Sequence, residues 1–128
     1  MSSNHSPRKG TQGIQHIFKA TCYSITGFKA VFRHEAAFRQ ILGINLILIP
    51  MSFLLPVNLV EQTVMVAVCL LAIIVELFNS AIAAFVDRIS VERHELSKNT
   101  KDMGSAAQFV ALVLIATTWG RILIGDSI

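Results

Sequence analysis

A short series of four polar residues and one alanine interrupts an apolar stretch in the middle of the chain. Its members are separated by three, one, three and four residues, so one helix would carry them on one narrow face. They are Glu76, Asn79, Ser80, Ala83 and Asp87. A carboxylate one helical turn from an amide could act as a general base that takes a proton from a hydroxyl group.

A purely structural interpretation of this series also stands. Asn79 and Ser80 can join helices by hydrogen bonding, and a buried Glu76 can be carried in its neutral form. However, an ionisable side chain inside a membrane span is costly when it faces lipid, so it usually faces protein or a cavity and marks a functional site. We therefore favour a catalytic role for Glu76 and keep helix packing as the alternative.

A second polar segment follows at residues 87–102. Ten of its sixteen residues are Asp, Glu, His, Lys, Arg or Asn, so it could simply be a solvated connection. It contains neither a glycine-rich phosphate loop of the Walker type nor a His/Cys cluster with zinc spacing. It could instead bind an anionic, metal-bearing ligand such as a nucleoside triphosphate, because carboxylates hold Mg²⁺ and lysine screens phosphate charge.

The elements that must position these residues are predicted to be membrane helices. The 128 residues are 53% hydrophobic and only 15% charged, with a mean hydropathy of +0.60. A bilayer-spanning helix needs about 20 predominantly apolar residues. Residues 41–60, 63–86 and 104–124 each supply that length. They leave too little sequence for a separate soluble catalytic domain, so we expect the chemistry to take place at the membrane.

The distribution of lysine and arginine predicts the orientation of these spans. Six basic residues precede the first span, none lies between the first and second, and four lie between the second and third. Because basic loops stay in the cytoplasm, the amino terminus and residues 87–102 are expected there, with the carboxyl terminus on the opposite side. The formal charge of +3 suits anionic lipid. Nucleic acid is not expected as a partner, because the basic residues flank apolar spans.

An amphipathic helix is predicted before the first span. Apolar residues recur at steps of three or four between Ile14 and Phe32. This pattern suits a helix that lies in the membrane interface, and equally one that packs against the spans. Residues 1–12 are polar and predicted to be disordered, and residues 13–128 are predicted to form a single membrane domain.

Three stretches resemble motifs of the prokaryotic diacylglycerol kinase family, in the family's order and with its spacing. They are Glu35–Gln40, Glu76–Ile82 with Val86–Arg88, and His94–Ser97 with Lys101–Ala107. The resemblance covers roughly residues 13–124. The last stretch is more similar to the Gram-negative diacylglycerol kinases than to the undecaprenol kinases of Gram-positive bacteria.

The resemblance implies an ATP-dependent lipid kinase. Such an enzyme transfers the γ-phosphate of MgATP to the hydroxyl group of diacylglycerol and forms phosphatidate at the bacterial inner membrane. It implies an all-α, multi-pass membrane fold, in which a surface helix precedes three spans and the carboxyl terminus is periplasmic. It also implies a homotrimer whose sites are shared between neighbouring protomers.

The same resemblance implies roles for individual residues. Glu76 would be the general base, and Glu35 would bind the metal ion that ATP carries. The residues that would contact the nucleotide are Tyr23, Glu35, Glu92, His94, Lys101 and Asp102, and those on the substrate side are His16, Asn79 and Ser105. Phosphoryl transfer is catalysed mainly by positioning the reactants and neutralising phosphate charge, and these side chains are of the types that can do both.

Three positions depart from the family's pattern. Ala83 stands where the family has a second metal-binding Glu, and a methyl group cannot bind Mg²⁺. His16 replaces a common Arg, and Ile41 replaces a common carboxylate. Either Glu35 and the phosphates hold the ion, or an acid such as Asp87 substitutes. Three hypotheses stay open: an active diacylglycerol kinase, a weak or silent member with a structural or lipid-binding role, and a kinase that acts on undecaprenol.

Overall fold

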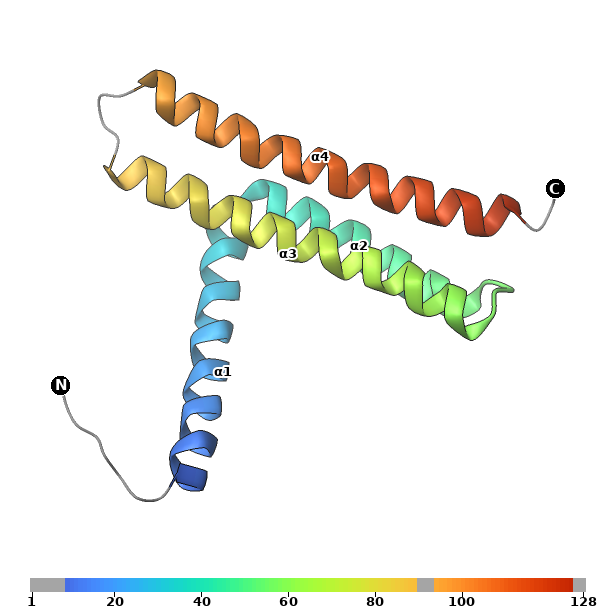
Figure 1. Cartoon of the computed structure of the whole chain (residues 1–128), viewed down its shortest axis with the longest axis horizontal. Helices are drawn as coiled ribbons and strands as arrows, with labels where there is room; N and C mark the ends of the chain where they lie inside the picture. The colour runs from blue at the N-terminus through green and yellow to red at the C-terminus, as the bar shows by residue number, and fades with distance from the viewer. Residues whose placement is uncertain (1–8, 90–93, 126–128) are drawn as a thin grey trace. The chain divides into compact units, whose positions relative to one another are not determined.

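A computed structural model describes residues 9–89 and 94–125, and this part of the chain is almost entirely α-helical (Figure 1). The helices are α1 (Lys9–His34), α2 (Ala36–Leu54), α3 (Leu59–Ile89) and α4 (His94–Gly125). The chain divides into two compact units, one that contains α1 and one, from Glu35 onward, that contains α2 to α4. The predicted all-α fold is therefore confirmed.

Helix α1 is a continuous amphipathic helix, and Gly27 does not break it. It already begins at Lys9, before the predicted boundary at residue 13, whereas residues 1–8 lie outside the described part. Its hydroxyl groups are satisfied locally: Thr21, Ser24 and Thr26 each donate to the carbonyl oxygen four residues earlier, at 2.9 to 3.1 Å. Its large apolar side chains are exposed, as a helix that lies on a lipid surface requires.

Helices α2, α3 and α4 are each long and apolar enough to cross a membrane, with lengths of 19, 31 and 32 residues. The three predicted spans are thus present, but the first ends at Leu54 and not at residue 60, and residues 59–60 belong to α3. Two of them are longer than expected, because α3 runs on to Ile89 and α4 starts at His94. Residues 87–89 and 94–102 of the polar segment are therefore helical. Lys98 pairs with Asp102 within α4, and Lys101 pairs with Asp87 of α3, while all four side chains stay partly exposed.

Helices α2 and α3 form an antiparallel pair around a short turn. A reciprocal capping arrangement starts α3, because the Glu61 amide donates to Asn58 Oδ1 (2.8 Å) and the Asn58 amide donates to Glu61 Oε1 (3.1 Å). Across the turn, Gln62 Nε2 donates to the Ser52 carbonyl oxygen at 3.2 Å. These bonds satisfy backbone groups that would otherwise be unpaired at the two helix ends.

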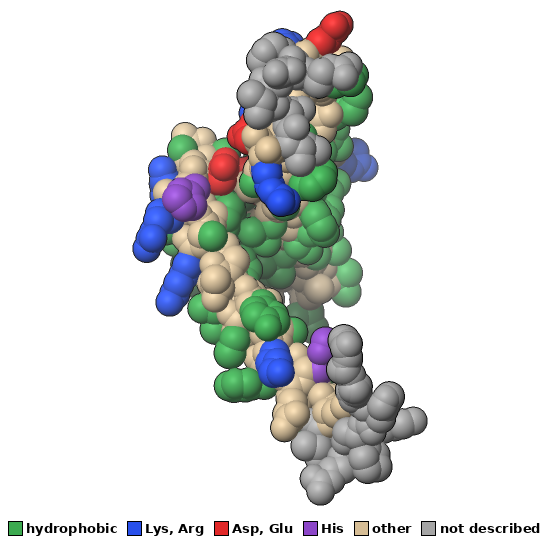
Figure 2. All heavy atoms as spheres, turned by 90° about the vertical axis from the view of Figure 1, so that its left-hand side faces the viewer, with side chains coloured by type: hydrophobic (Ala, Val, Ile, Leu, Met, Phe, Trp, Pro, Cys, Tyr) green, Lys and Arg blue, Asp and Glu red, His purple; other side chains and the backbone are tan. Residues whose placement is uncertain are grey.

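The core lies where α3 packs against both α2 and α4. Its members are Ile41, Met65, Val68, Cys69, Ala72, Ala111, Ile115 and Trp119. The indole Nε1 of Trp119 donates to the Met65 carbonyl oxygen at 3.2 Å, which joins α4 to α3. Many large apolar side chains point outward instead, as expected for helices surrounded by lipid. Figure 2 shows charged side chains gathered at the end of the bundle where α3 ends and α4 begins.

We predict that Asn58→Ala lowers the free energy of unfolding by about 1 kcal/mol, because it removes the side-chain acceptor at the start of α3. Unfolding in mixed detergent micelles, followed by circular dichroism, measures the change. Asn58→Asp is the matched control, since its carboxylate can accept the same hydrogen bond, and it should stay near the wild type. Equal losses in both variants would contradict the capping role.

Candidate active site

Glu76 is the buried centre of the α2–α4 unit. Its residue exposure is only 2%, although the side chain is ionisable. Both carboxylate oxygens accept hydrogen bonds: Oε2 from Ser80 Oγ at 3.2 Å, and Oε1 from Gln108 Nε2 at 2.9 Å. The polar face of α3 predicted from residue spacing thus faces α4, and Glu76 does not point into lipid.

Gln108 supplies the contact from α4. It is 8% exposed, and its Nε2 also donates to the Ala72 carbonyl oxygen at 3.3 Å. The antiparallel packing of α3 and α4 brings it there across 32 residues of sequence. Gln108 was not among the predicted site residues, yet a signal existed, because it is the only amide side chain in the predicted span 104–124.

Asn79 lies one helical turn after Glu76 and also faces α4. A Cβ atom added at Gly104 would collide with Asn79 Oδ1 and would lie 3.0 Å from Asn79 Cγ. The α4 backbone therefore approaches this amide closely, and a larger residue at position 104 would require the Asn79 side chain or α4 to shift. Gly104 belongs to the third family-like motif, and this contact gives its glycine a physical reason.

We predict that Gly104→Ala forces Asn79 or α4 to move and lowers stability by about 1–3 kcal/mol, which is typical of overpacking. Gly120→Ala is the matched control in the same helix, since a Cβ there meets no atom within 4 Å. Thermal unfolding in detergent compares the two variants. Equal stability of both would show that the close approach of Asn79 does not exist.

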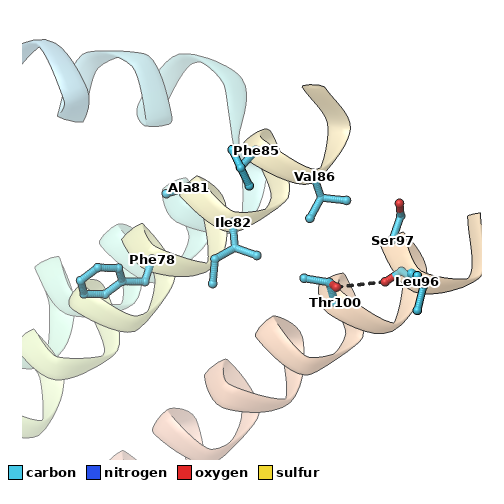
Figure 3. A pocket seen from close by; sticks show the side chains of 8 residues that line it. All are labelled: Phe78, Ala81, Ile82, Phe85, Val86, Leu96, Ser97 and Thr100. Atoms are coloured by element: carbon cyan, nitrogen blue, oxygen red, sulfur yellow. Dashed lines mark hydrogen bonds between the residues drawn. The ribbon is translucent and has the colours of Figure 1, made fainter. Parts of the chain in front are cut away.

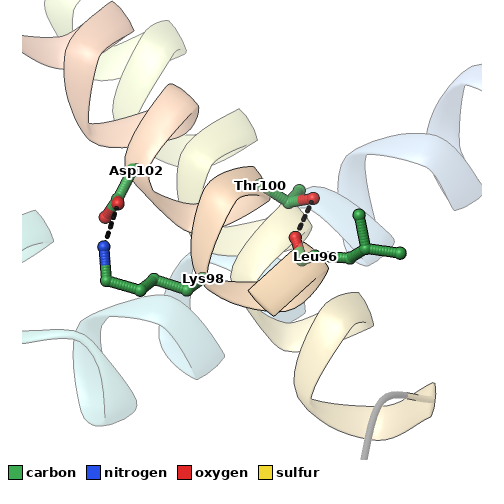
Figure 4. A network of polar contacts seen from close by, with 4 residues as sticks. All are labelled: Leu96, Lys98, Thr100 and Asp102. Carbon is green, nitrogen blue, oxygen red and sulfur yellow. Dashed lines mark hydrogen bonds and ion pairs between the residues drawn. The ribbon is translucent and has the colours of Figure 1, made fainter. Parts of the chain in front are cut away.

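Two ion pairs lie near the end of this helix pair where α3 ends and α4 begins. Lys101 Nζ of α4 lies 2.5 Å from Asp87 Oδ1 of α3, and Lys98 Nζ lies 2.8 Å from Asp102 Oδ2 within α4 (Figure 4). All four side chains are substantially exposed. Because exposed ion pairs contribute little stability, these groups can exchange partners with an incoming charged ligand at small cost.

An apolar pocket of about 480 Å³ lies between α3 and α4 near this end (Figure 3). It is lined by Phe78, Ala81, Ile82, Phe85, Val86, Leu96, Ser97 and Thr100. The Thr100 hydroxyl donates to the Leu96 carbonyl oxygen at 2.9 Å and so is already satisfied. None of the predicted site residues lines this pocket.

The remaining predicted residues occupy four settings. Glu35 is half-buried in extended backbone just before α2, and its carboxylate makes no capping hydrogen bond. Ser105 is exposed on α4. Tyr23, with 72% exposure, and His16 are exposed on α1, in the other unit. Glu92 and the side chain of His94 lie outside the described part.

The residues that could hold a metal ion are few. Within residues 9–89 and 94–125, no group of three or more His, Cys, Asp or Glu side chains is arranged to bind one. Ala83 is half-buried on α3 and offers no donor atom. Mg²⁺ commonly keeps several waters and binds through one or two carboxylates plus phosphate oxygens. Among the described residues Glu35 offers one such carboxylate, so the side chains present would suit only an ion that keeps water or phosphate oxygens as its other ligands.

The fold and site define a class of protein. It is a helical membrane protein with three spans, a buried carboxylate that accepts hydrogen bonds, and charged side chains at the end where α3 ends and α4 begins. Residues 22–123 match the family model described as prokaryotic diacylglycerol kinase. The chain belongs to this family, which makes it a kinase-type enzyme. The predicted resemblance is thereby confirmed.

Individual relatives agree with the family match along nearly the whole chain. A protein named diacylglycerol kinase from Pseudomonas aeruginosa is 62% identical over 120 residues, which are 94% of this chain and 98% of the relative. The diacylglycerol kinase of Haemophilus influenzae is 44% identical, covering 88% of this chain and 96% of its own. That of Escherichia coli K12 is 42% identical, covering 85% and 89%.

Proposed function

We propose that this protein is an ATP-dependent lipid kinase that phosphorylates 1,2-diacylglycerol to phosphatidate, with Glu76 as the general base. The observation that carries the proposal is the Glu76 carboxylate, buried between two membrane helices and oriented by Ser80 and Gln108. A membrane protein has little reason to bury a carboxylate unless it serves a function. The names of its relatives supply the substrate class.

In the proposed reaction the Glu76 carboxylate takes the proton of the lipid hydroxyl group. Each of its oxygens accepts one hydrogen bond within the protein, so each retains a lone pair for that proton. The lipid oxygen then forms a bond to the γ-phosphorus while the bond from this phosphorus to the β–γ bridging oxygen breaks. ADP leaves with that electron pair, phosphatidate forms, and the proton remains on Glu76 until it returns to water.

Residues at the charged end would hold the nucleotide. Lys101 would exchange Asp87 for the phosphates, which is feasible because both side chains are partly exposed. Glu35 would bind the Mg²⁺ that neutralises phosphate charge during transfer. The remaining proposed nucleotide contacts are Tyr23, Glu92, His94 and Asp102, and the proposed substrate contacts are His16, Asn79 and Ser105.

The proposed setting is the bacterial inner membrane, with the amino terminus in the cytoplasm and the carboxyl terminus in the periplasm. The excess of lysine and arginine before α2 and in residues 87–102 supports this orientation. It also puts the proposed nucleotide contacts on the cytoplasmic side, where ATP is found. A homotrimer with sites shared between protomers is proposed on the family resemblance. The exposed apolar surface of the α2–α4 unit leaves room for helix contacts between copies.

A second candidate is a weak or silent family member with a structural or lipid-binding role, and Ala83 is the observation that favours it. Asp87 pairs with Lys101 in the structure, so it would be available to replace the missing carboxylate only when Lys101 exchanges it for the phosphates. Undecaprenol is a less favoured acceptor, since the relatives described above are named diacylglycerol kinases.

The direct test is transfer of labelled phosphate from [γ-³²P]ATP to diacylglycerol by purified protein in mixed micelles with Mg²⁺. The wild type should form labelled phosphatidate, and Glu76→Gln should reduce its rate by about 10²-fold or more, since general-base catalysis contributes that much. Glu61→Gln, at the opposite end of α3, is the matched control and should retain wild-type activity. Background activity of the wild type at every Mg²⁺ concentration would reject the kinase in favour of the silent member.

We predict that Ala83→Glu lowers the Mg²⁺ concentration needed for half-maximal activity, because it adds a carboxylate on the face of α3 that carries Glu76. Titration of activity with Mg²⁺ at constant ATP measures this concentration. Ala83→Gln has the same length without the charge and should leave the requirement nearly unchanged. An unchanged requirement in Ala83→Glu would mean that position 83 does not face the metal.

A further inference from the structure

Gln108 satisfies two acceptors on α3 with a single amide nitrogen. Its Nε2 lies 2.9 Å from Glu76 Oε1 and 3.3 Å from the Ala72 carbonyl oxygen, so both of its N–H groups are used. Its Oε1 is buried and has no hydrogen-bond partner among the described residues. If the amide were flipped, its oxygen would face Glu76 Oε1 and the Ala72 carbonyl oxygen, so the observed orientation is the one in which the amide donates to both.

From this geometry we infer that Gln108 is a positioning residue for the proposed base: it ties the Glu76 carboxylate to α4 and limits its rotation. The inference rests on the proposed function. Ser80 alone cannot fix the carboxylate, since it lies one turn away on the same helix and donates one bond at 3.2 Å. Gln108 comes from a different helix, so it also fixes the base relative to the residues that α4 carries.

The contact couples the base to the proposed nucleotide end through one rigid element. Lys101 and Asp102 lie on α4 two turns before Gln108. Because α4 is continuous between them, a shift of this helix along α3 would move the proposed phosphate contacts and the donor to Glu76 together. Gln108 therefore fixes how α4 lies along α3, and this alignment places the proposed base and the proposed phosphate contacts relative to each other.

The kinetic test is Gln108→Met, which keeps the length of the side chain and removes both donors. A misplaced catalytic group costs about ten- to hundredfold in rate, so kcat should fall by that factor while KM for ATP and for diacylglycerol stays within about twofold. Gln62→Met is the matched control. It also removes an amide donor to a backbone carbonyl, at the other end of α3, and should leave kcat unchanged.

A wild-type kcat in Gln108→Met, or equal losses in both variants, would overturn the inference. In a Glu76→Gln background, Gln108→Met should cause no additional loss, because the group it positions is gone. An additional loss of tenfold or more would show that Gln108 acts independently of Glu76, which would also overturn it.

A second measurement does not depend on activity or on the stability of Gln108→Met. The side-chain amide proton signals of Gln108, observed by NMR in ¹⁵N-glutamine-labelled protein, should shift when Glu76 is replaced by Leu. The Gln62 signals should stay in place. Unshifted Gln108 signals would refute the contact. If the wild type makes no phosphatidate but the Gln108 signals shift, the proposed function fails and the Glu76–Gln108 contact stands.

Discussion

The arrangement of this protein depends on keeping one carboxylate inside a bundle that lipid surrounds. Glu76 is almost fully buried in α3, and an ionisable group there is tolerated only if donors replace the water that it loses. Ser80 supplies one donor from the same helix, and Gln108 supplies the other from α4. Because the second donor lies on another helix, satisfying Glu76 also determines how α3 and α4 lie along each other.

The other contacts between α3 and α4 occur with the two helices in this same alignment. At one end Trp119 bonds to the Met65 carbonyl, and at the other Lys101 pairs with Asp87. Gly104 lets α4 approach Asn79 between the buried carboxylate and the ion pairs. The helix pair thus carries a buried polar layer around Glu76 and an exposed charged layer at the end where α3 ends and α4 begins. In the proposed reaction the buried layer would receive the lipid hydroxyl group and the charged layer would receive the phosphates.

Much of the fold and part of the candidate site could be predicted from the sequence, because hydropathy and residue spacing are properties of a single helix. The three spans and the common face of Glu76 and Asn79 follow from such local patterns. Gln108 could not be paired with Glu76 in the same way, since the two residues are 32 positions apart and their pairing depends on the register of two helices. The helical ends of the 87–102 segment were also missed. A run of charged residues suggests a solvated loop unless their ion pairs, such as that of Asp87 with Lys101, are known.

The contact between Glu76 and Gln108 is the most direct point at which to test this account. Solid-state NMR of the protein in lipid bilayers, with ¹³C-labelled glutamate and ¹⁵N-labelled glutamine side chains, measures the dipolar coupling between the Glu76 carboxyl carbon and Gln108 Nε2. A nitrogen–oxygen separation of 2.9 Å places these two sites close enough for a small but measurable coupling, which disappears in Gln108→Met. Absence of this coupling in the wild type would contradict the account, because the proposed base would then be held by something other than α4.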